Sequence, residues 1–155
     1  MIKLARILYP TDFSELSLAA LKYAQEFARQ FDAQLHCLHV VDEAYHYWLA
    51  LGPDGVPVGP DPNELLRSTE AQMQQFVGEH LAEAPKLVAK VVTGRPFIEI
   101  IHYAREQAID LIVIATHGRS GLRHVLMGSV AERVVRKAPC PVLTCRAAEH
   151  EFVMP

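Results

Sequence analysis

Short apolar runs alternate with longer segments of helical periodicity along almost the whole chain. The apolar runs predict strands at residues 6–9, 35–41, 87–92, 111–115 and 141–145. Between them, apolar residues three or four positions apart would share one face of a helix, which predicts helices at about 14–30, 66–81, 97–108 and 128–136. The run at 111–115 is almost entirely apolar, which is typical of a strand covered on both faces.

This alternation of strands and helices predicts an α/β fold. Parallel strands require crossover connections, and these are right-handed, so the leading architecture is an open, doubly wound five-stranded parallel sheet with helices on both faces. Ligands of such sheets bind beyond the carboxyl ends of the strands, where the strand order switches. We therefore expect the functional loops to follow Tyr9, Val41, Val92 and Ala115.

One connection, residues 43–62, is longer than most loops in compact domains and contains Trp48, the only tryptophan. It leaves the carboxyl end of the second predicted strand. Two interpretations stay open: the segment folds over the site as a lid, or its aromatic half packs locally or against a partner chain.

Composition narrows the class of protein further. A chain of 155 residues that is 50% hydrophobic suits one domain, which we expect to span residues 1–146 and to be followed by a tail at 147–155. The net charge of −3 offers no basic surface for a nucleic acid. The sequence shows neither a signal peptide nor an apolar run of the roughly 20 residues that span a bilayer, so we expect a cytoplasmic protein with no membrane partner.

The cysteines and histidines do not form an evident metal or disulfide pattern. Cys37, Cys140 and Cys145 include no closely spaced pair, and the last two are too far apart on an extended strand to form a disulfide. His36 and His39 lie three positions apart on a predicted strand and should point to opposite faces. We predict no metal site and no catalytic residue.

The segment from Ala115 to Ser129 is the strongest candidate for binding an anion, since the dinucleotide and P-loop glycine motifs are both absent. Gly118 and Gly121 allow the backbone to approach a ligand closely, and a helix is expected to begin at Gly128-Ser129, with its positive dipole end facing the loop. Arg119 and Arg123 add positive charge. In the alternative interpretation Ser129 caps that helix and the loop binds nothing.

Two further residues have open roles. Asp12 precedes a predicted helix and has Glu15 three positions later, so it is either a helix cap or a ligand contact, or both. His117 lies inside the glycine-containing loop, where its imidazole either contacts a phosphate or fixes the loop.

Several motifs together resemble the universal stress protein family. These are PTDFSE after the first strand, LHVVD at the end of the second, GRPFIEI before the third helix, DLIVIATHG, and the long run ATHGRSGLRHVLMGSVAERVVRKAPCPVL. The resemblance covers nearly the whole chain except the 43–62 segment and the tail.

The resemblance implies a Rossmann-like domain, similar to adenine nucleotide alpha hydrolases, that binds ATP with or without Mg²⁺ in stress-response signalling. In the ATP-binding branch the signature is Gly, two residues, Gly, nine residues and Gly-Ser/Thr. Gly118 and Gly128-Ser129 match it, but Ala115 replaces the first glycine. The extra methyl is either absorbed by a small shift or clashes at a cost of roughly 1–3 kcal/mol.

By the same resemblance, Gly118, Gly128, Ser129 and Val130 would hold the phosphates and ribose, and Thr11, Asp12 and the backbone of Val41 would face the adenine and sugar. The full set of candidate ATP-binding residues is Pro10, Thr11, Asp12, Val41, Ile114, Ala115, His117, Gly118, Arg119, Gly128, Ser129 and Val130.

The resemblance further implies a homodimer through the last strand, Pro141 to Cys145. Val142 and Leu143 are expected at a sheet edge, which can pair with a second copy. Two other functions stay open: an interaction protein of the same fold without a nucleotide, or a slow ATPase. The protein partner is not identified by the sequence.

Overall fold

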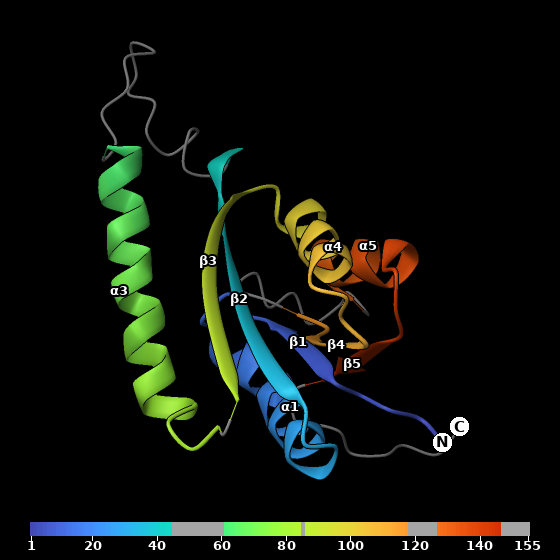
Figure 1. Cartoon of the computed structure of the whole chain (residues 1–155). Coiled ribbons are helices and arrows are strands. Elements are labelled where there is room, and N and C mark those ends of the chain that lie inside the picture. The colour runs from blue at the N-terminus through green and yellow to red at the C-terminus, as the bar shows by residue number, and fades with distance from the viewer. Residues whose placement is uncertain (45–60, 85, 118–126, 147–155) are drawn as a thin grey trace, which may run out of the picture.

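The computed structural model describes residues 1–44, 61–84, 86–117 and 127–146 (Figure 1). The strands are β1 (Arg6–Pro10), β2 (Gln34–Asp42), β3 (Leu87–Gly94), β4 (Leu111–Ala115) and β5 (Val142–Cys145). The helices are α1 (Leu18–Gln30), preceded by the short 3-10 helix η1 (Glu15–Ser17), then α3 (Pro62–His80), α4 (Pro96–Glu106) and α5 (Ser129–Lys137).

All five strands are parallel and form one sheet in the order β3-β2-β1-β4-β5. The chain builds outward from β1 through β2 to β3, then returns to place β4 on the other side of β1. The strand order therefore switches between β1 and β4. The predicted doubly wound, five-stranded parallel sheet is confirmed.

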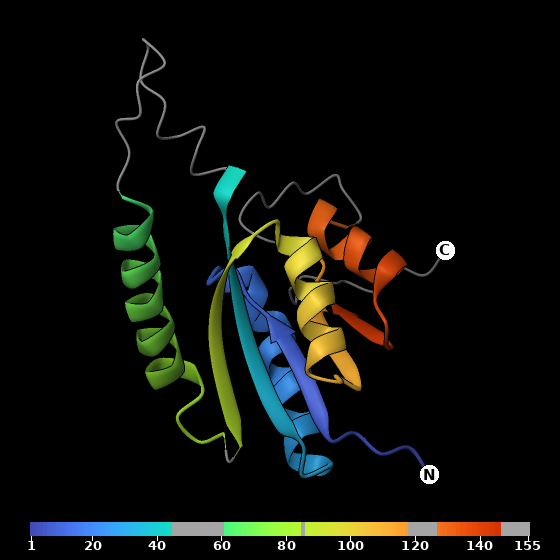
Figure 2. The same cartoon turned by 45° about the horizontal axis from the view of Figure 1, so that its top comes forward.

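Each face of the sheet is covered by its own pair of helices (Figure 2). Alternate residues of β1 and β4, such as Ile7 and Val113, pack in a core with α1 and α3. Their neighbours Leu8 and Ile112 pack in a second core with α4 and α5. This alternation explains why the central strands are apolar at nearly every position, since both of their faces are buried.

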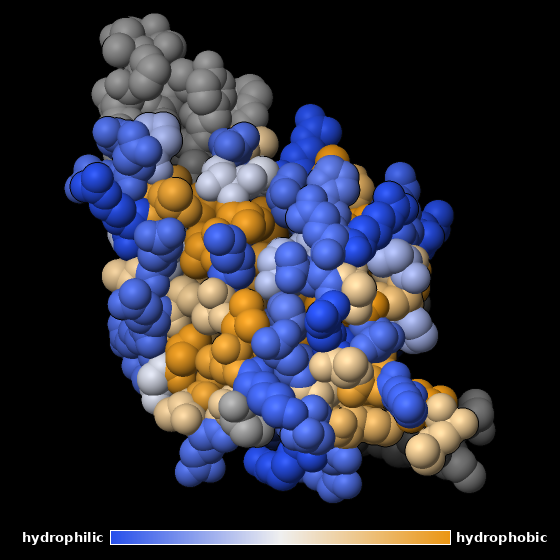
Figure 3. Space-filling view, viewed as in Figure 1, coloured by the Kyte–Doolittle hydropathy of each residue, from blue (hydrophilic) through white to orange (hydrophobic). Residues whose placement is uncertain are grey.

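The surface of the molecule has distinct polar and apolar areas. Figure 3 shows polar side chains over α3 and α4, and apolar side chains gathered between these helices, over β3. Strand β3 is an edge strand, and its valines are only half-buried. No helix among the described ranges has the length and apolar character needed to cross a membrane.

Some element boundaries differ from the prediction. Helix α3 begins at Pro62, four residues earlier than expected, because the Asp61 side chain accepts a hydrogen bond from the Asn63 N–H at 2.8 Å and Pro62 needs no donor there. Strand β1 includes Pro10, one residue beyond the predicted end. The predicted 43–62 connection, including Trp48, lies for the most part outside the described residues, as do Gly118, Arg119, Arg123 and the tail at 147–155.

Candidate functional site

The loop after β1 folds into a tight turn stabilised by its own side chains. The Thr11 N–H donates to the Leu38 carbonyl at 2.9 Å, which continues the pairing with β2. Phe13 then adopts φ 62°, in the left-handed region that bulky residues rarely occupy. The Phe13 N–H donates to Thr11 Oγ1 and the Ser14 N–H donates to Asp12 Oδ1, each at 3.0 Å. Thr11 and Asp12 therefore both shape the loop that would present them to a ligand.

A chain of buried hydroxyl groups connects this loop to the start of the first helix. The Ser17 hydroxyl donates to the Ser14 carbonyl at 2.6 Å, so its single proton is used there. The Thr11 hydroxyl, 3.0 Å from Ser17 Oγ, must then be the donor of that pair. Tyr9 Oη donates to the Ser17 carbonyl at 3.0 Å. Burial raises the pKa of Tyr9 to about 12, which keeps this donor protonated.

Aromatic rings support the loop from the side of β2 and α3. The Phe13 ring stacks on His39, with ring centroids 4.3 Å apart and an interplanar angle of 24°. Phe76 of α3 lies on Phe13 at 5.4 Å in a tilted arrangement. His36, three residues earlier on β2, instead contacts the Tyr103 hydroxyl of α4 at 2.9 Å. The prediction that the two histidines point to opposite faces is therefore confirmed.

The end of β4 is tied to the start of α5. The Thr116 N–H donates to the Cys145 carbonyl at 2.8 Å, and the Gly128 N–H donates to the Thr116 carbonyl at 2.6 Å. A Cβ at Gly128 would lie 3.1 Å from that carbonyl oxygen, tighter than ordinary side-chain contacts. Thr116 Oγ1 also lies 3.1 Å from His117 Nδ1. Gly128 thus permits the close approach of α5 to the end of β4.

Two helix-cap interpretations are wrong in detail. Gly128 is the N-cap of α5, and Ser129 is its first helical residue. Ser14, whose side chain accepts from the Ser17 N–H, is the N-cap of η1, while Asp12 accepts from Ser14 instead. Ser129 and Val130 therefore belong to the first turn of α5, so their N–H groups lie at the positive end of the helix dipole.

Most of the candidate residues that the structure describes lie at the ends of two adjacent strands and at the start of a helix. Thr11 and Asp12 follow β1, His117 follows β4, and Gly128 to Val130 begin α5. The side chains of Pro10, Val41 and Ile114 are buried within the sheet, so these three residues can offer only backbone atoms to a ligand. Gly118 and Arg119 lie outside the described residues.

The methyl group of Ala115 points away from α5. Ala115 packs against the core under α1, whereas the neighbouring Ile114 packs in the core under α4 and α5. The side chain that replaces the expected glycine is therefore accommodated on the face of the sheet opposite the start of α5.

Sequence reasoning missed four residues that build this site: Tyr9, Phe13, Ser17 and His39. Ser17 and His39 act through partners on other elements, and nothing in the sequence indicates the positive φ of Phe13. It also missed Thr116, although a polar residue at the end of a predicted strand was an available signal.

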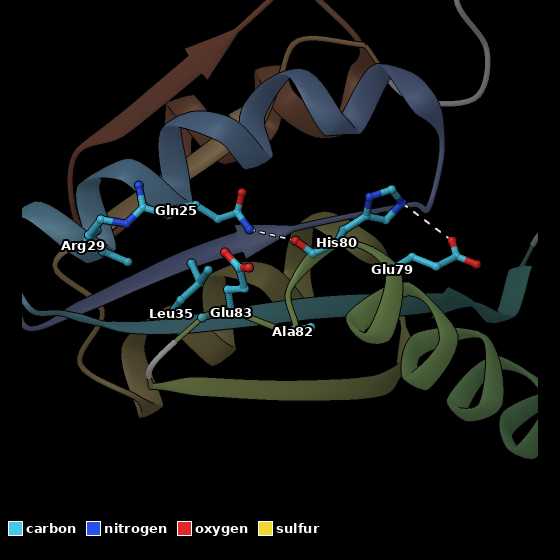
Figure 4. Close-up of a pocket in the computed structure, with 9 residues that line it drawn as sticks. Gln25, Arg29, Leu35, Glu79, His80, Ala82 and Glu83 are labelled. Carbon is cyan, nitrogen blue, oxygen red and sulfur yellow. Dashed lines mark hydrogen bonds and ion pairs between the residues drawn. The ribbon is translucent and has the colours of Figure 1, made fainter.

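A separate cavity of about 310 Å³ lies near the opposite end of the sheet, between α1 and the turn after α3 (Figure 4). Gln25, His80 and Glu83 line it, and Gln25 Nε2 donates to the His80 carbonyl at 2.8 Å. None of the candidate ATP-binding residues lines this cavity. Within the described ranges, no group of three or more His, Cys, Asp or Glu could hold a metal ion.

The three cysteines are free thiols, and burial raises the pKa of each one. The pKa of Cys37 reaches about 12. Protonated thiols are weak nucleophiles, so the structure gives the cysteines a packing role. Cys37 and Cys145 are buried, and Cys140 is half-buried.

The fold and the loops at its switch point define a class: a doubly wound α/β domain with polar, hydrogen-bonded loops at the carboxyl ends of its strands. The universal stress protein family model matches residues 3–146, and the chain belongs to this family. Universal stress protein MJ0531 of Methanocaldococcus jannaschii is 35% identical over 147 residues, which cover 94% of this chain and 84% of that protein.

Two solved structures of related proteins share this fold. The structure of protein MJ0577 has a TM-score of 0.79 at 30% identity and covers 96% of this chain and 100% of its own. Universal stress protein UspA from Lactobacillus plantarum has a TM-score of 0.72 at 32% identity, with coverage of 94% and 100%.

Proposed function

We propose that this chain binds an adenine nucleotide, ATP first of all, at the carboxyl ends of β1, β2 and β4, and that it acts in stress-response signalling. The observation that carries the proposal is the bond from the Gly128 N–H to the Thr116 carbonyl. This bond holds the start of α5 against the end of β4, beside the switch point of the sheet, where the N–H groups of a helix's first turn suit a phosphate.

The loop after β1 supplies the opposite wall of the proposed site. Thr11 and Asp12 are held by bonds to Phe13, Ser14 and Ser17, so a ligand would meet a loop whose shape is already set. A preformed loop reduces the entropy lost on binding.

Two related structures add support from the same family. One is a universal stress protein in complex with cAMP, and the other is an Archaeoglobus fulgidus universal stress protein in complex with dAMP, each 21% identical to this chain. Both ligands contain adenine. At this identity the two structures share the fold with this chain, and their ligands belong to those proteins.

Mg²⁺ would reach the site with the nucleotide. Because the described residues offer no cluster of metal ligands, the phosphate oxygens and water would supply most of its coordination. The Asp12 carboxylate accepts a hydrogen bond from the Ser14 N–H at 3.0 Å, so one of its oxygens already holds the loop.

Isothermal titration with magnesium ATP tests the proposal. Asp12→Asn removes the charge but keeps an oxygen that accepts from Ser14, and we expect it to weaken binding about tenfold. Glu83→Gln is the matched control, because the same carboxylate-to-amide change lies in the distant cavity and should leave the affinity unchanged.

Absence of saturable heat in the wild-type protein would reject the proposal in favour of a nucleotide-free interaction protein. Equal loss of affinity in both variants would place the nucleotide elsewhere. Release of inorganic phosphate that disappears in Asp12→Asn would establish the slow ATPase.

We further propose that the protein forms a homodimer through β5. This strand lies at the edge of the sheet, and among the described strands it pairs with β4 alone. A lysine on the edge opposes strand pairing, so Thr144→Lys should shift sedimentation toward the monomer. Thr93→Lys on the opposite edge strand β3 is the control, and dissociation by both variants equally would contradict a β5 interface.

A further inference from the structure

His39 ties β2 to the loop that would face the nucleotide. Its side chain is 8% exposed, and Nδ1 lies 2.8 Å from the Thr11 carbonyl oxygen. A carbonyl only accepts, so Nδ1 carries the proton and donates. The Thr11 N–H donates to the carbonyl of Leu38, the residue before His39. Consecutive residues of β2 therefore hold Thr11 through both its N–H and its carbonyl.

The same imidazole also supports the unusual backbone of Phe13. A φ of 62° is unfavourable for a bulky residue and persists only where the surroundings enforce it. The His39 ring covers one side of the Phe13 ring at 4.3 Å, and Phe76 contacts it at 5.4 Å. Asp12 lies between the two residues that His39 holds, so the position of Asp12 depends on both contacts.

We infer that His39 is a positioning residue for the nucleotide site, acting through a hydrogen bond to Thr11 and a ring stack on Phe13. The inference rests on the proposed function. His39 acts through the loop, whose conformation presents Thr11 and Asp12 to the adenine and sugar.

Three substitutions separate the two contacts. His39→Ala removes both, His39→Asn keeps a donor near the position of Nδ1, and His39→Phe keeps the ring. We expect His39→Ala to weaken magnesium ATP binding by a factor on the order of 30, and each of the other two variants to recover part of the loss.

His36→Ala is the matched control. It removes a second buried histidine from the same strand, one that hydrogen-bonds to Tyr103 and Gln34 on the opposite face. This variant should lower the unfolding midpoint without changing the affinity. Wild-type affinity in His39→Ala, or affinity that falls with stability alike in both alanine variants, would overturn the inference.

Amide hydrogen exchange distinguishes this inference from the proposed function, because it is measured without nucleotide. In His39→Ala the Phe13 and Ser14 amides should exchange about tenfold faster than in the wild type, and in His36→Ala they should not change. If the wild type binds no ATP, the proposed function fails while this measurement still reports on the loop. Unchanged exchange in His39→Ala would overturn the positioning role.

Discussion

The two ends of the sheet handle polar groups in opposite ways. At the carboxyl ends, Thr11, Ser17, His39 and Thr116 are buried and hydrogen-bonded. At the amino ends, the Lys86–Asp32 ion pair beside the cavity has side chains that are 47% and 83% exposed. Buried polar groups are costly unless each finds its partner, so a satisfied network permits few alternative arrangements. Of these two described regions, the loops at the carboxyl ends are therefore the more tightly held, which suits the proposed nucleotide site.

The largest loss of stability is expected from breaking the chain of buried hydroxyl groups that joins Thr11, Ser17 and Tyr9. Ser17→Ala leaves the Thr11 hydroxyl without its acceptor and is expected to lower the free energy of unfolding by about 1–3 kcal/mol. Urea denaturation measures the change. Ser68→Ala, an exposed serine on α3 that donates to the Leu65 carbonyl, is the control and should stay within about 0.5 kcal/mol. Equal effects would remove the contrast between buried and exposed hydroxyl groups.

The second-largest loss of stability is expected from a substitution that crowds the start of α5. Gly128→Ala places a methyl 3.1 Å from the Thr116 carbonyl, so we expect a loss of about 1–2 kcal/mol in stability and weaker ATP binding. Gly78→Ala in α3 meets nothing within 4 Å and should stabilise the protein by about 0.5–1 kcal/mol. Thermal unfolding and titration of both variants test the pair. A neutral Gly128→Ala would contradict the close approach.

The buried His36 predicts a dependence of stability on pH. Burial and, to a smaller extent, Arg6 lower the pKa of His36 below its ordinary value of 6.5. The folded protein then binds fewer protons than the unfolded chain, so this contribution is present above pH 6.5 and is lost as the pH falls through and below it.

His36→Gln should remove that dependence. Urea titrations from about pH 8 to about pH 5 are expected to show the wild type losing more stability than the variant. Parallel pH profiles would show that His36 is not held neutral by its surroundings.

A smaller loss of stability is expected when the methyl group of Ala115 is removed. Ala115→Gly removes a methyl from the core under α1 and adds backbone freedom in a strand, which should cost about 0.5–1 kcal/mol. The affinity for ATP should stay within about threefold of the wild type, because the methyl points away from α5. A large gain in affinity would show that the methyl obstructs the nucleotide.

The smallest change in stability is expected from a substitution at the amino ends of the strands. Lys86→Ala breaks an exposed ion pair and should change the free energy of unfolding by less than about 1 kcal/mol. Chemical denaturation at low and high salt checks this. A larger loss would mean that this end of the sheet is as tightly built as the other.

The fold could be predicted from the sequence because apolar spacing reports directly on burial. The run at 111–115 became the interior strand β4, between β1 and β5, and the helical spacing before residue 30 became α1. The early start of α3 at Pro62 was missed because the prediction followed apolar spacing from Leu66, whereas the start depends on the Asp61 cap.

The candidate site could be predicted only in part. Motifs pointed to Thr11, Asp12 and Gly128, which have local signatures. The roles of Ser17 and His39 depend on the pairing of β1 with β2 and on the left-handed Phe13, neither of which is visible in local sequence. Contacts between distant segments thus determine how the recognised residues are held.

The most direct test of the central claim is titration of the nucleotide-free protein with magnesium ATP, with Asp12→Asn and Glu83→Gln in parallel. We expect saturable binding near one nucleotide per chain, weakened by Asp12→Asn and unaffected by Glu83→Gln. No binding to the wild type would contradict nucleotide binding by this chain, and binding that Glu83→Gln alone disrupts would contradict a site at the carboxyl ends of the strands.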